Sequence, residues 1–207
     1  GLVMRLVDPA TQSADNPLKL VVGDTAARVA LAGDRYLITA GGKGWTGQAD
    51  ALGRWQVGRK PDVRGDADRF ALGRDGSVAA FSARSHTFTV VSPDGERRTV
   101  DVSPIEGADR DVLQVAFVGT TPVVLDTTTG RLHLPGAQPV DVRGDGSSLQ
   151  LQESGDDSER VIVATGSGWV AVPLSGGRPT PVTRDKVGGA PVRPEVVAGC
   201  AYGAWGG

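Results

Sequence analysis

The chain repeats itself with a period of about 40 residues. Five valine-containing segments each end in an acidic residue, and these residues are 42, 40, 39 and 40 positions apart. The five are VVGD ending at Asp24, VRGD at Asp66, VSPIE at Glu106, VRGD at Asp145 and VTRD at Asp185. A period of this length that contains about four short strands is typical of one blade of a β-propeller. Because a lone four-stranded sheet cannot bury both of its faces, such repeats must stack face to face.

The strand pattern is clearest in residues 71–102. Short runs rich in Val, Phe and Thr are separated there by the turn dipeptides Asp75-Gly76 and Asp94-Gly95. This pattern predicts four antiparallel strands joined by tight turns that need a positive φ. Similar patterns occupy 28–45, 113–142 and 149–183. No comparable helical periodicity competes with them, so we expect an all-β fold of four-stranded antiparallel blades.

The two ends of the chain have the pattern of half blades. Residues 4–22 are typical of a third and a fourth strand, and residues 191–207 of a first strand and part of a second. We therefore predict a single domain over 1–207, with four full blades plus two half blades that form either a five-bladed ring or an arc of a larger propeller. Such ends would expose strand edges and permit self-association. The next acidic corner would fall beyond Gly207, so we expect a fragment of a larger ectodomain.

Charge and cysteine content narrow the classes of partner. The 22 Lys and Arg residues against 24 Asp and Glu residues, with a pI near 5.7, provide no basic field for nucleic acid. No apolar run reaches the roughly 18 residues that a membrane span needs. The single cysteine, Cys200, cannot form an internal disulfide. We expect it to pair with a cysteine outside this segment, and a buried free thiol is the alternative.

Several short motifs are explained better by structure than by chemistry. Both Arg-Gly-Asp tripeptides fall at repeat corners, which favours a turn over an adhesion site. Gly41–Gly44 lacks the spacing of a phosphate-binding loop and predicts a hairpin turn. His86 and His133 have no third ligand nearby, so we predict neither a metal nor a cofactor.

The tryptophans provide the candidate binding surface. Trp45, Trp55 and Trp169 could form an aromatic platform for a carbohydrate. Trp45 and Trp169 also fall near the start of predicted third strands, where packing between blades is the competing explanation.

Particular segments of the chain resemble a known family. They are VDPATQ at 7–12, RVALAGDRYLI at 28–38, PVVLDTTTGRLHL at 122–134, 149–182, and 188–207 with PVR followed by GCAYGAW. Over nearly its whole length the chain resembles the propeller-like extracellular region of actinobacterial membrane-anchored proteins with fibronectin type III or other immunoglobulin-like repeats. The resemblance implies a place on the outer side of the cell membrane and adds no catalytic motif.

Two functions from different classes are compatible with these features. The favoured one is a non-enzymatic interaction or scaffolding module of the cell envelope that binds a protein or glycan through propeller loops. The alternative is a hydrolase or lyase with its site at the mouth of the propeller channel. It depends on carboxylates that recur in phase, at Asp66, Asp145 and Asp185.

Overall fold

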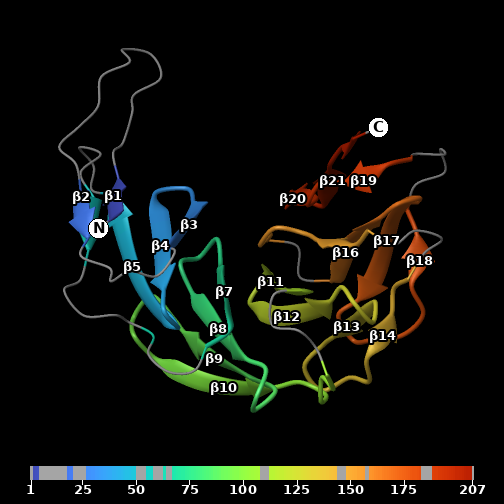
Figure 1. The fold of residues 1–207 in the computed structure, drawn as a ribbon, viewed down its shortest axis with the longest axis horizontal. Coiled ribbons are helices and arrows are strands. Elements are labelled where there is room, and N and C mark those ends of the chain that lie inside the picture. Colours follow the sequence, from blue (N-terminus) through green and yellow to red (C-terminus); the bar gives the residue numbers. More distant parts are fainter. Residues whose placement is uncertain are drawn as a thin grey trace. The chain divides into compact units, whose positions relative to one another are not determined.

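A computed structural model describes most of the chain. The described residues are 2–4, 18–20, 27–49, 55–57, 63, 67–107, 112–143, 148–156, 159–182 and 188–206. The chain divides into two compact units, Gly1–Ala67 and Asp68–Gly207. Figure 1 labels the strands of both units. The described residues include no helix long and apolar enough to cross a membrane.

The described residues of the first unit form one hairpin and one four-stranded sheet. The hairpin pairs β1 (Leu2–Met4) with β2 (Leu18–Leu20), and the antiparallel sheet has the order β3 (Arg28–Ala32), β4 (Arg35–Ala40), β5 (Lys43–Ala49) and β6 (Trp55–Val57). Gly41 and Gly42 join β4 to β5 with φ values of 55° and 71°. These positive φ values are favourable for glycine and confirm the predicted hairpin turn.

In the part of the second unit that the structure describes there are three four-stranded sheets, each a simple antiparallel meander. The first is β7 (Arg69–Leu72), β8 (Val78–Ser82), β9 (Thr87–Val91) and β10 (Arg97–Asp101). The second is β11 (Leu113–Val118), β12 (Thr121–Asp126), β13 (Arg131–His133) and β14 (Val140–Asp141). The third is β15 (Gln150–Leu151), β16 (Arg160–Thr165), β17 (Gly168–Pro173) and β18 (Thr180–Pro181). Four strands per repeat are thus confirmed.

The carboxyl-terminal segment differs in detail from the prediction. In place of one strand and part of a second, it forms four short strands: β19 (Ala190–Pro191), β20 (Glu195–Val197), β21 (Cys200–Tyr202) and β22 (Trp205–Gly206). β20 pairs with β21, and β19 pairs with β22. Ala198 and Gly199, with φ values of 49° and 75°, make the tight turn between β20 and β21. The structure thus adds the short pair of β19 and β22 to the two strands that the sequence predicts.

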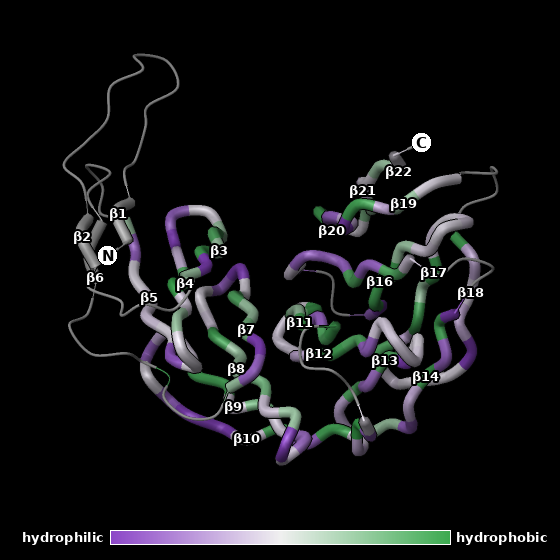
Figure 2. Tube along the Cα trace, in the orientation of Figure 1, coloured by the Kyte–Doolittle hydropathy of each residue, from purple (hydrophilic) through white to green (hydrophobic). Residues whose placement is uncertain are grey.

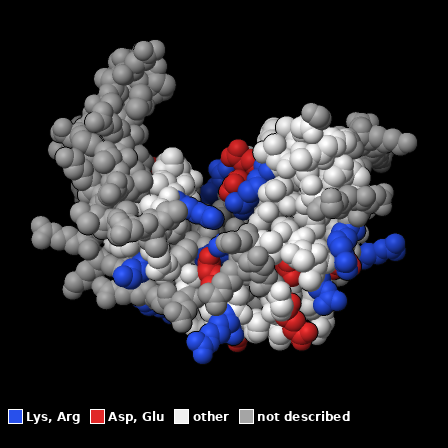
Figure 3. Space-filling model, in the orientation of Figure 1, with Lys and Arg blue, Asp and Glu red and all other residues white. Residues whose placement is uncertain are grey.

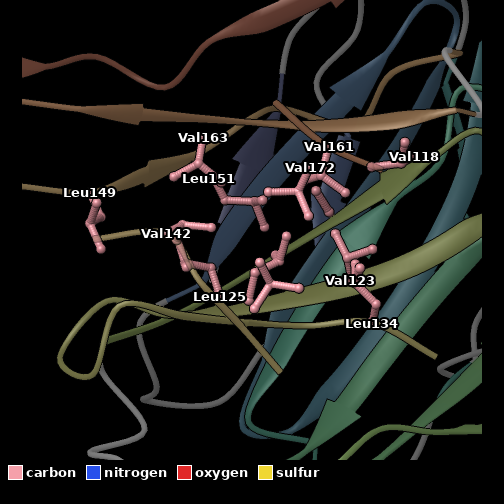
Figure 4. Close-up of a cluster of buried hydrophobic side chains, with 13 residues drawn as sticks. Val118, Val123, Leu125, Leu134, Val142, Leu149, Leu151, Val161, Val163 and Val172 are labelled. Carbon is pink, nitrogen blue, oxygen red and sulfur yellow. The ribbon is translucent and has the colours of Figure 1, made fainter. Parts of the chain in front are cut away.

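The second sheet of this unit buries side chains on both of its faces. Along β11, Ala116 and Val118 belong to one core cluster, while Val115 and Phe117 belong to another. Successive strand residues point to opposite faces, so one run of apolar residues supplies both cores. Figure 4 shows the cluster between the second and third sheets, where Leu125 and Val123 approach Leu151 and Val161. Figure 2 shows hydrophobic residues in inner strands such as β8 and β12, whereas the edge strand β10 is largely hydrophilic.

The third sheet is also covered on its far face, the one that points away from the second sheet. Ile162 of β16 and Ala171 of β17 pack against Val196 of β20. The β20–β21 hairpin therefore occupies the position that the next blade would take against this sheet. This face-to-face stacking of sheets is what the 40-residue period predicts.

The predicted repeat corners are only partly covered by the structure. Glu106 lies in the segment that follows β10. The corners at Asp24, Asp66, Asp145 and Asp185 lie outside the described residues, so the in-phase carboxylates behind the hydrolase or lyase alternative do too.

Candidate functional site

Two hollows lie at equivalent places of successive repeats in the second unit. Hollow A, of about 600 Å³, is lined by Ser103–Glu106, Asp126, Thr128, Thr129, Arg131, His133, Gln138, Pro139 and Arg143. Hollow B, of about 350 Å³, is lined by Asp141–Arg143, Thr165, Ser167–Val170, Arg178, Pro179 and Pro181. Thr128 in hollow A and Ser167 in hollow B are 39 residues apart, and Pro139 and Pro179 are 40 apart. The repeat therefore builds the same frame twice and lines it with different side chains.

The turn at the edge of each hollow is held by a side chain at the end of the second strand. In hollow A, the buried Asp126 carboxylate accepts hydrogen bonds from the backbone N–H groups of Thr128 (2.9 Å) and Thr129 (3.3 Å) and from Thr129 Oγ1 (2.6 Å). In hollow B, Thr165 Oγ1 instead accepts from Ser167 N (3.2 Å) and donates to Gly168 O (3.0 Å). Asp126 is thus engaged in stabilising its turn.

The two histidines both contact residues 102–105, the crossing segment that leads from β10 of the first sheet toward the second sheet. His86, in the turn after β8, accepts a hydrogen bond from Ile105 N at Nδ1 (3.2 Å), and its carbonyl accepts one from Val102 N (3.0 Å). From β13, His133 Nδ1 lies 2.8 Å from Ser103 Oγ. Both histidines therefore contact residues 102–105, a pairing that no spacing in the sequence indicates. Within the described ranges, no three His, Cys, Asp or Glu side chains gather as metal ligands would.

The environment of His133 favours its neutral form. Burial lowers the pKa of the imidazole below its ordinary value of 6.5, and the Ser103 carbonyl and the Asp126 charge oppose this shift only in part. The side chain is only 2% exposed. Near neutral pH, a neutral His133 therefore holds the crossing segment against the second sheet.

We expect acidification to destabilise the protein through His133. Because the folded pKa is lowered, the unfolded chain binds more protons as the pH falls through about 6.5, and the free energy of unfolding decreases toward and below that pH. In His133→Asn the side chain does not titrate and retains a polar atom near the Nδ1 position. Melting temperatures at pH 7.5 and 5.5 should differ more in the wild type than in this variant. Equal differences in the two proteins would contradict the role given to His133.

Arg143 forms a wall that the two hollows share. Its Nη2 and Nε lie 3.1 and 3.4 Å from the two carboxylate oxygens of Asp141. This hydrogen bonding by Arg143 lowers the pKa of the Asp141 carboxyl. The stem of Arg143 covers Gly130, where an added Cβ would lie 2.0 Å from Arg143 Cγ. Gly130 also has a φ of 66°, so both backbone conformation and space favour glycine there.

The three candidate tryptophans do not form an equivalent set. Trp45 lies in β5 opposite Ile38, in the third pair from the β4–β5 turn, whereas Trp169 lies in β17 opposite Ala164, in the second pair from its turn. Adjacent pairs face opposite sides, so the two rings leave opposite faces of their own sheets. Trp55 begins β6, and its side chain lies outside the described residues.

Trp169 both packs and lines a hollow. It contributes to hollow B, and its ring centroid lies 5.4 Å from that of Trp205. Trp205 Nε1 donates a hydrogen bond to Thr165 O (2.8 Å). The ring packs against the cluster of Ile162, Ala171 and Val196, whereas Val170 beside it points toward the second sheet, so the packing explanation holds for the Trp169 ring. The contribution of Trp205 depends on β22, which the sequence analysis did not predict.

Cys200 is a free, exposed thiol at the start of β21. We expect it to react with a thiol reagent such as Ellman's reagent in the native protein, to the same stoichiometry as in denaturant. Cys200→Ser should abolish the reaction and leave the melting temperature unchanged. Slow labelling that requires denaturation would favour the buried thiol over a cysteine that is accessible to a disulfide partner.

Comparison with solved structures identifies the architecture. Virginiamycin B lyase from Staphylococcus aureus aligns with a TM-score of 0.57 at 11% identity, over 93% of this chain and 66% of that one. Apo AztD from Citrobacter koseri aligns with a TM-score of 0.53 at 15% identity, over 99% of this chain and 62% of that one. Both are β-propellers. The fold of this chain is propeller-like.

The likeness to these propellers concerns the fold alone. A streptogramin B lyase structure is similar at 10% identity, with a TM-score of 0.58 over 94% of this chain and 66% of that one. The chain thus spans just under two thirds of the length of these propellers. No protein-family model matches the chain, and no curated protein matches it.

Proposed function

We propose that this chain is a non-enzymatic binding module of an actinobacterial cell envelope, on the outer side of the membrane, which holds an envelope protein or glycan through its propeller loops. The observation that carries the proposal is the pair of hollows A and B. Their frames recur with the repeat, but their linings differ, as expected where a rigid scaffold carries variable recognition loops. The place in the envelope rests on the family resemblance.

The distribution of charge is also compatible with such a partner. On the face shown in Figure 3, basic and acidic side chains of the described residues lie in small mixed groups. A surface of this kind favours local recognition by a few side chains over long-range attraction to a polyanion. Hollow B adds two prolines to its charged residues.

A binding experiment with matched variants tests the proposal. The immobilised chain is exposed to an envelope extract and to a glycan array. Thr128→Trp and Ser167→Trp place a large side chain at equivalent exposed positions of hollows A and B, and Glu96→Trp adds an exposed tryptophan in the β9–β10 turn. Retention of a specific protein or glycan that is reduced by one hollow variant but not by Glu96→Trp supports the function. Retention of nothing, or equal retention by all three variants, contradicts it.

A further inference from the structure

We propose that the crossing segment, residues 102–105, is a pH-sensitive wall of hollow A, which loosens when His86 and His133 take up protons and so releases a ligand from the hollow. The proposal rests on the binding function above and names the regulation of one of its two hollows.

The crossing segment forms one side of hollow A and is held there by two kinds of contact. Ser103, Pro104 and Ile105 belong to the lining of the hollow. The side chains of Val102 and Ile105 are buried in the apolar cluster between the first and second sheets, and this contact does not depend on pH. Within the described ranges, every hydrogen bond of the segment is made to one of the two histidines. The polar half of the attachment therefore depends on the state of these two rings.

His86 can hold the segment only as an uncharged ring. Its Nδ1 accepts the hydrogen bond from Ile105 N at 3.2 Å, so this nitrogen carries no proton and the proton of the ring is on Nε2. A second proton would go to Nδ1 and turn the acceptor into a donor. Two donors would then face each other, and the contact with Ile105 would be lost.

His133 opposes protonation for a different reason. A charged ring could still donate from Nδ1 to the Ser103 carbonyl, 3.2 Å away, but the charge would lie in a side chain that is 2% exposed. Burial accordingly lowers the pKa of His133, and the His86 charge adds to this effect. A loosened segment would admit water to the ring and let it bind the proton more tightly, so a falling pH favours the loosened state.

The surrounding charged groups do not change in the same pH range. They are Asp126 of β12, Arg131 of β13, Arg84 of the β8–β9 turn, Asp68, which accepts a hydrogen bond from Ala83 of that turn, and Asp101 and Glu106 at the ends of the crossing segment. Carboxylates ordinarily titrate near pH 4 and guanidinium groups above pH 12, whereas imidazoles titrate near pH 6.5. The sequence contains two histidines, and both meet at this segment.

Hydrogen exchange followed by mass spectrometry tests the loosening directly. Protection factors are compared at pH 7.5 and 5.5, because they remove the intrinsic effect of pH on exchange. In peptides that contain residues 102–106 they should fall about tenfold, the factor that corresponds to one unit of pKa. Peptides of β16 and β17 in the third sheet are the internal control and should lose less than about twofold.

A double variant, His86→Asn with His133→Asn, separates proton uptake from other effects of acid. Each asparagine places an amide oxygen near the Nδ1 position and does not titrate, and the φ of 57° at residue 86 is one that asparagine tolerates. Residues 102–106 should then be equally protected at both pH values. Three results would overturn the proposal: unchanged protection of this segment in the wild type, an equal loss in β16 and β17, or the same loss in the double variant. The first and second of these need no variant to fold.

The consequence for binding has its own readout. A ligand retained from envelope extract through hollow A, as shown by its sensitivity to Thr128→Trp, should leave the wild-type chain in a wash at pH 5.5 and stay on the double variant. A ligand retained through hollow B should stay on both proteins. Loss from both proteins alike would contradict release by the histidines. Retention of nothing at either pH would contradict the binding function, while hydrogen exchange would still decide whether the segment loosens.

Discussion

Replacing Phe81 by alanine should lower the free energy of unfolding by about 4 kcal/mol, a large fraction of the roughly 5–15 kcal/mol that stabilises a typical domain. Phe81 is fully buried, and its ring centroid lies 4.8 Å from that of Phe88, its cross-strand neighbour. Phe117 of the next sheet belongs to the same cluster. The truncation would therefore open a cavity between two sheets that cannot easily close.

Urea unfolding followed by tryptophan fluorescence measures this loss. Phe81→Leu, which keeps most of the volume, should lose only about 1 kcal/mol. Val182→Ala is a surface control, because Val182 is 47% exposed, and should change stability by less than about 0.5 kcal/mol. If Phe81→Ala were as well tolerated as Val182→Ala, the stacked-sheet core would not be the main source of stability.

Removal of Arg193 should be the second large effect, at about 3 kcal/mol for Arg193→Ala. Its Nε donates to Leu151 O (3.0 Å), and its Nη2 lies 3.2 Å from Val115 O and 3.0 Å from Gln152 O. One guanidinium thus connects β11, β15 and the carboxyl-terminal segment. Truncation would leave several backbone carbonyls without this donor.

The partner of Arg193 provides the matched control. Burial lowers the pKa of the Arg193 guanidinium, and the Glu153 carboxylate, 3.3 Å away, partly offsets that shift. The Glu153 side chain is 55% exposed, so Glu153→Gln should cost less than about 1 kcal/mol. The stability loss of Arg193→Lys should lie between those of Arg193→Ala and Glu153→Gln, because an ammonium cannot reproduce the planar set of donors of a guanidinium. If Arg193→Ala and Glu153→Gln lowered the denaturant midpoint by similar amounts, the hydrogen bonds of Arg193 to the backbone carbonyls would contribute little to stability.

The architecture of the repeats could be predicted because its determinants are local. Apolar alternation and turn dipeptides specify short strands, and Gly76 and Gly95 do adopt positive φ values, both 90°. The 40-residue period then requires sheet stacking, whatever the details of each loop. A strand such as β11, whose neighbouring residues Ala116 and Phe117 point into different cores, follows from that requirement.

The site was less predictable because its contacts join residues far apart in the chain. Arg193 reaches a carbonyl 78 positions away, and His133 reaches a serine 30 positions away. No spacing pattern in one sequence specifies such pairs. A shift of one residue in hairpin register also separated Trp45 from Trp169, although both were correctly placed in third strands. A register difference of one residue depends on the turn and on the packing around it.

The position of Arg143 between the two hollows has a thermodynamic consequence. One side chain cannot adapt independently to two ligands. A ligand in hollow B that draws the guanidinium away from Asp141 changes the wall of hollow A, and the stem that covers Gly130 carries the change. Two ligands that both contact Arg143 would therefore be linked, and linkage is reciprocal: each would alter the affinity of the other by the same factor. A polymer that lies across both hollows would meet a cooperative pair of subsites.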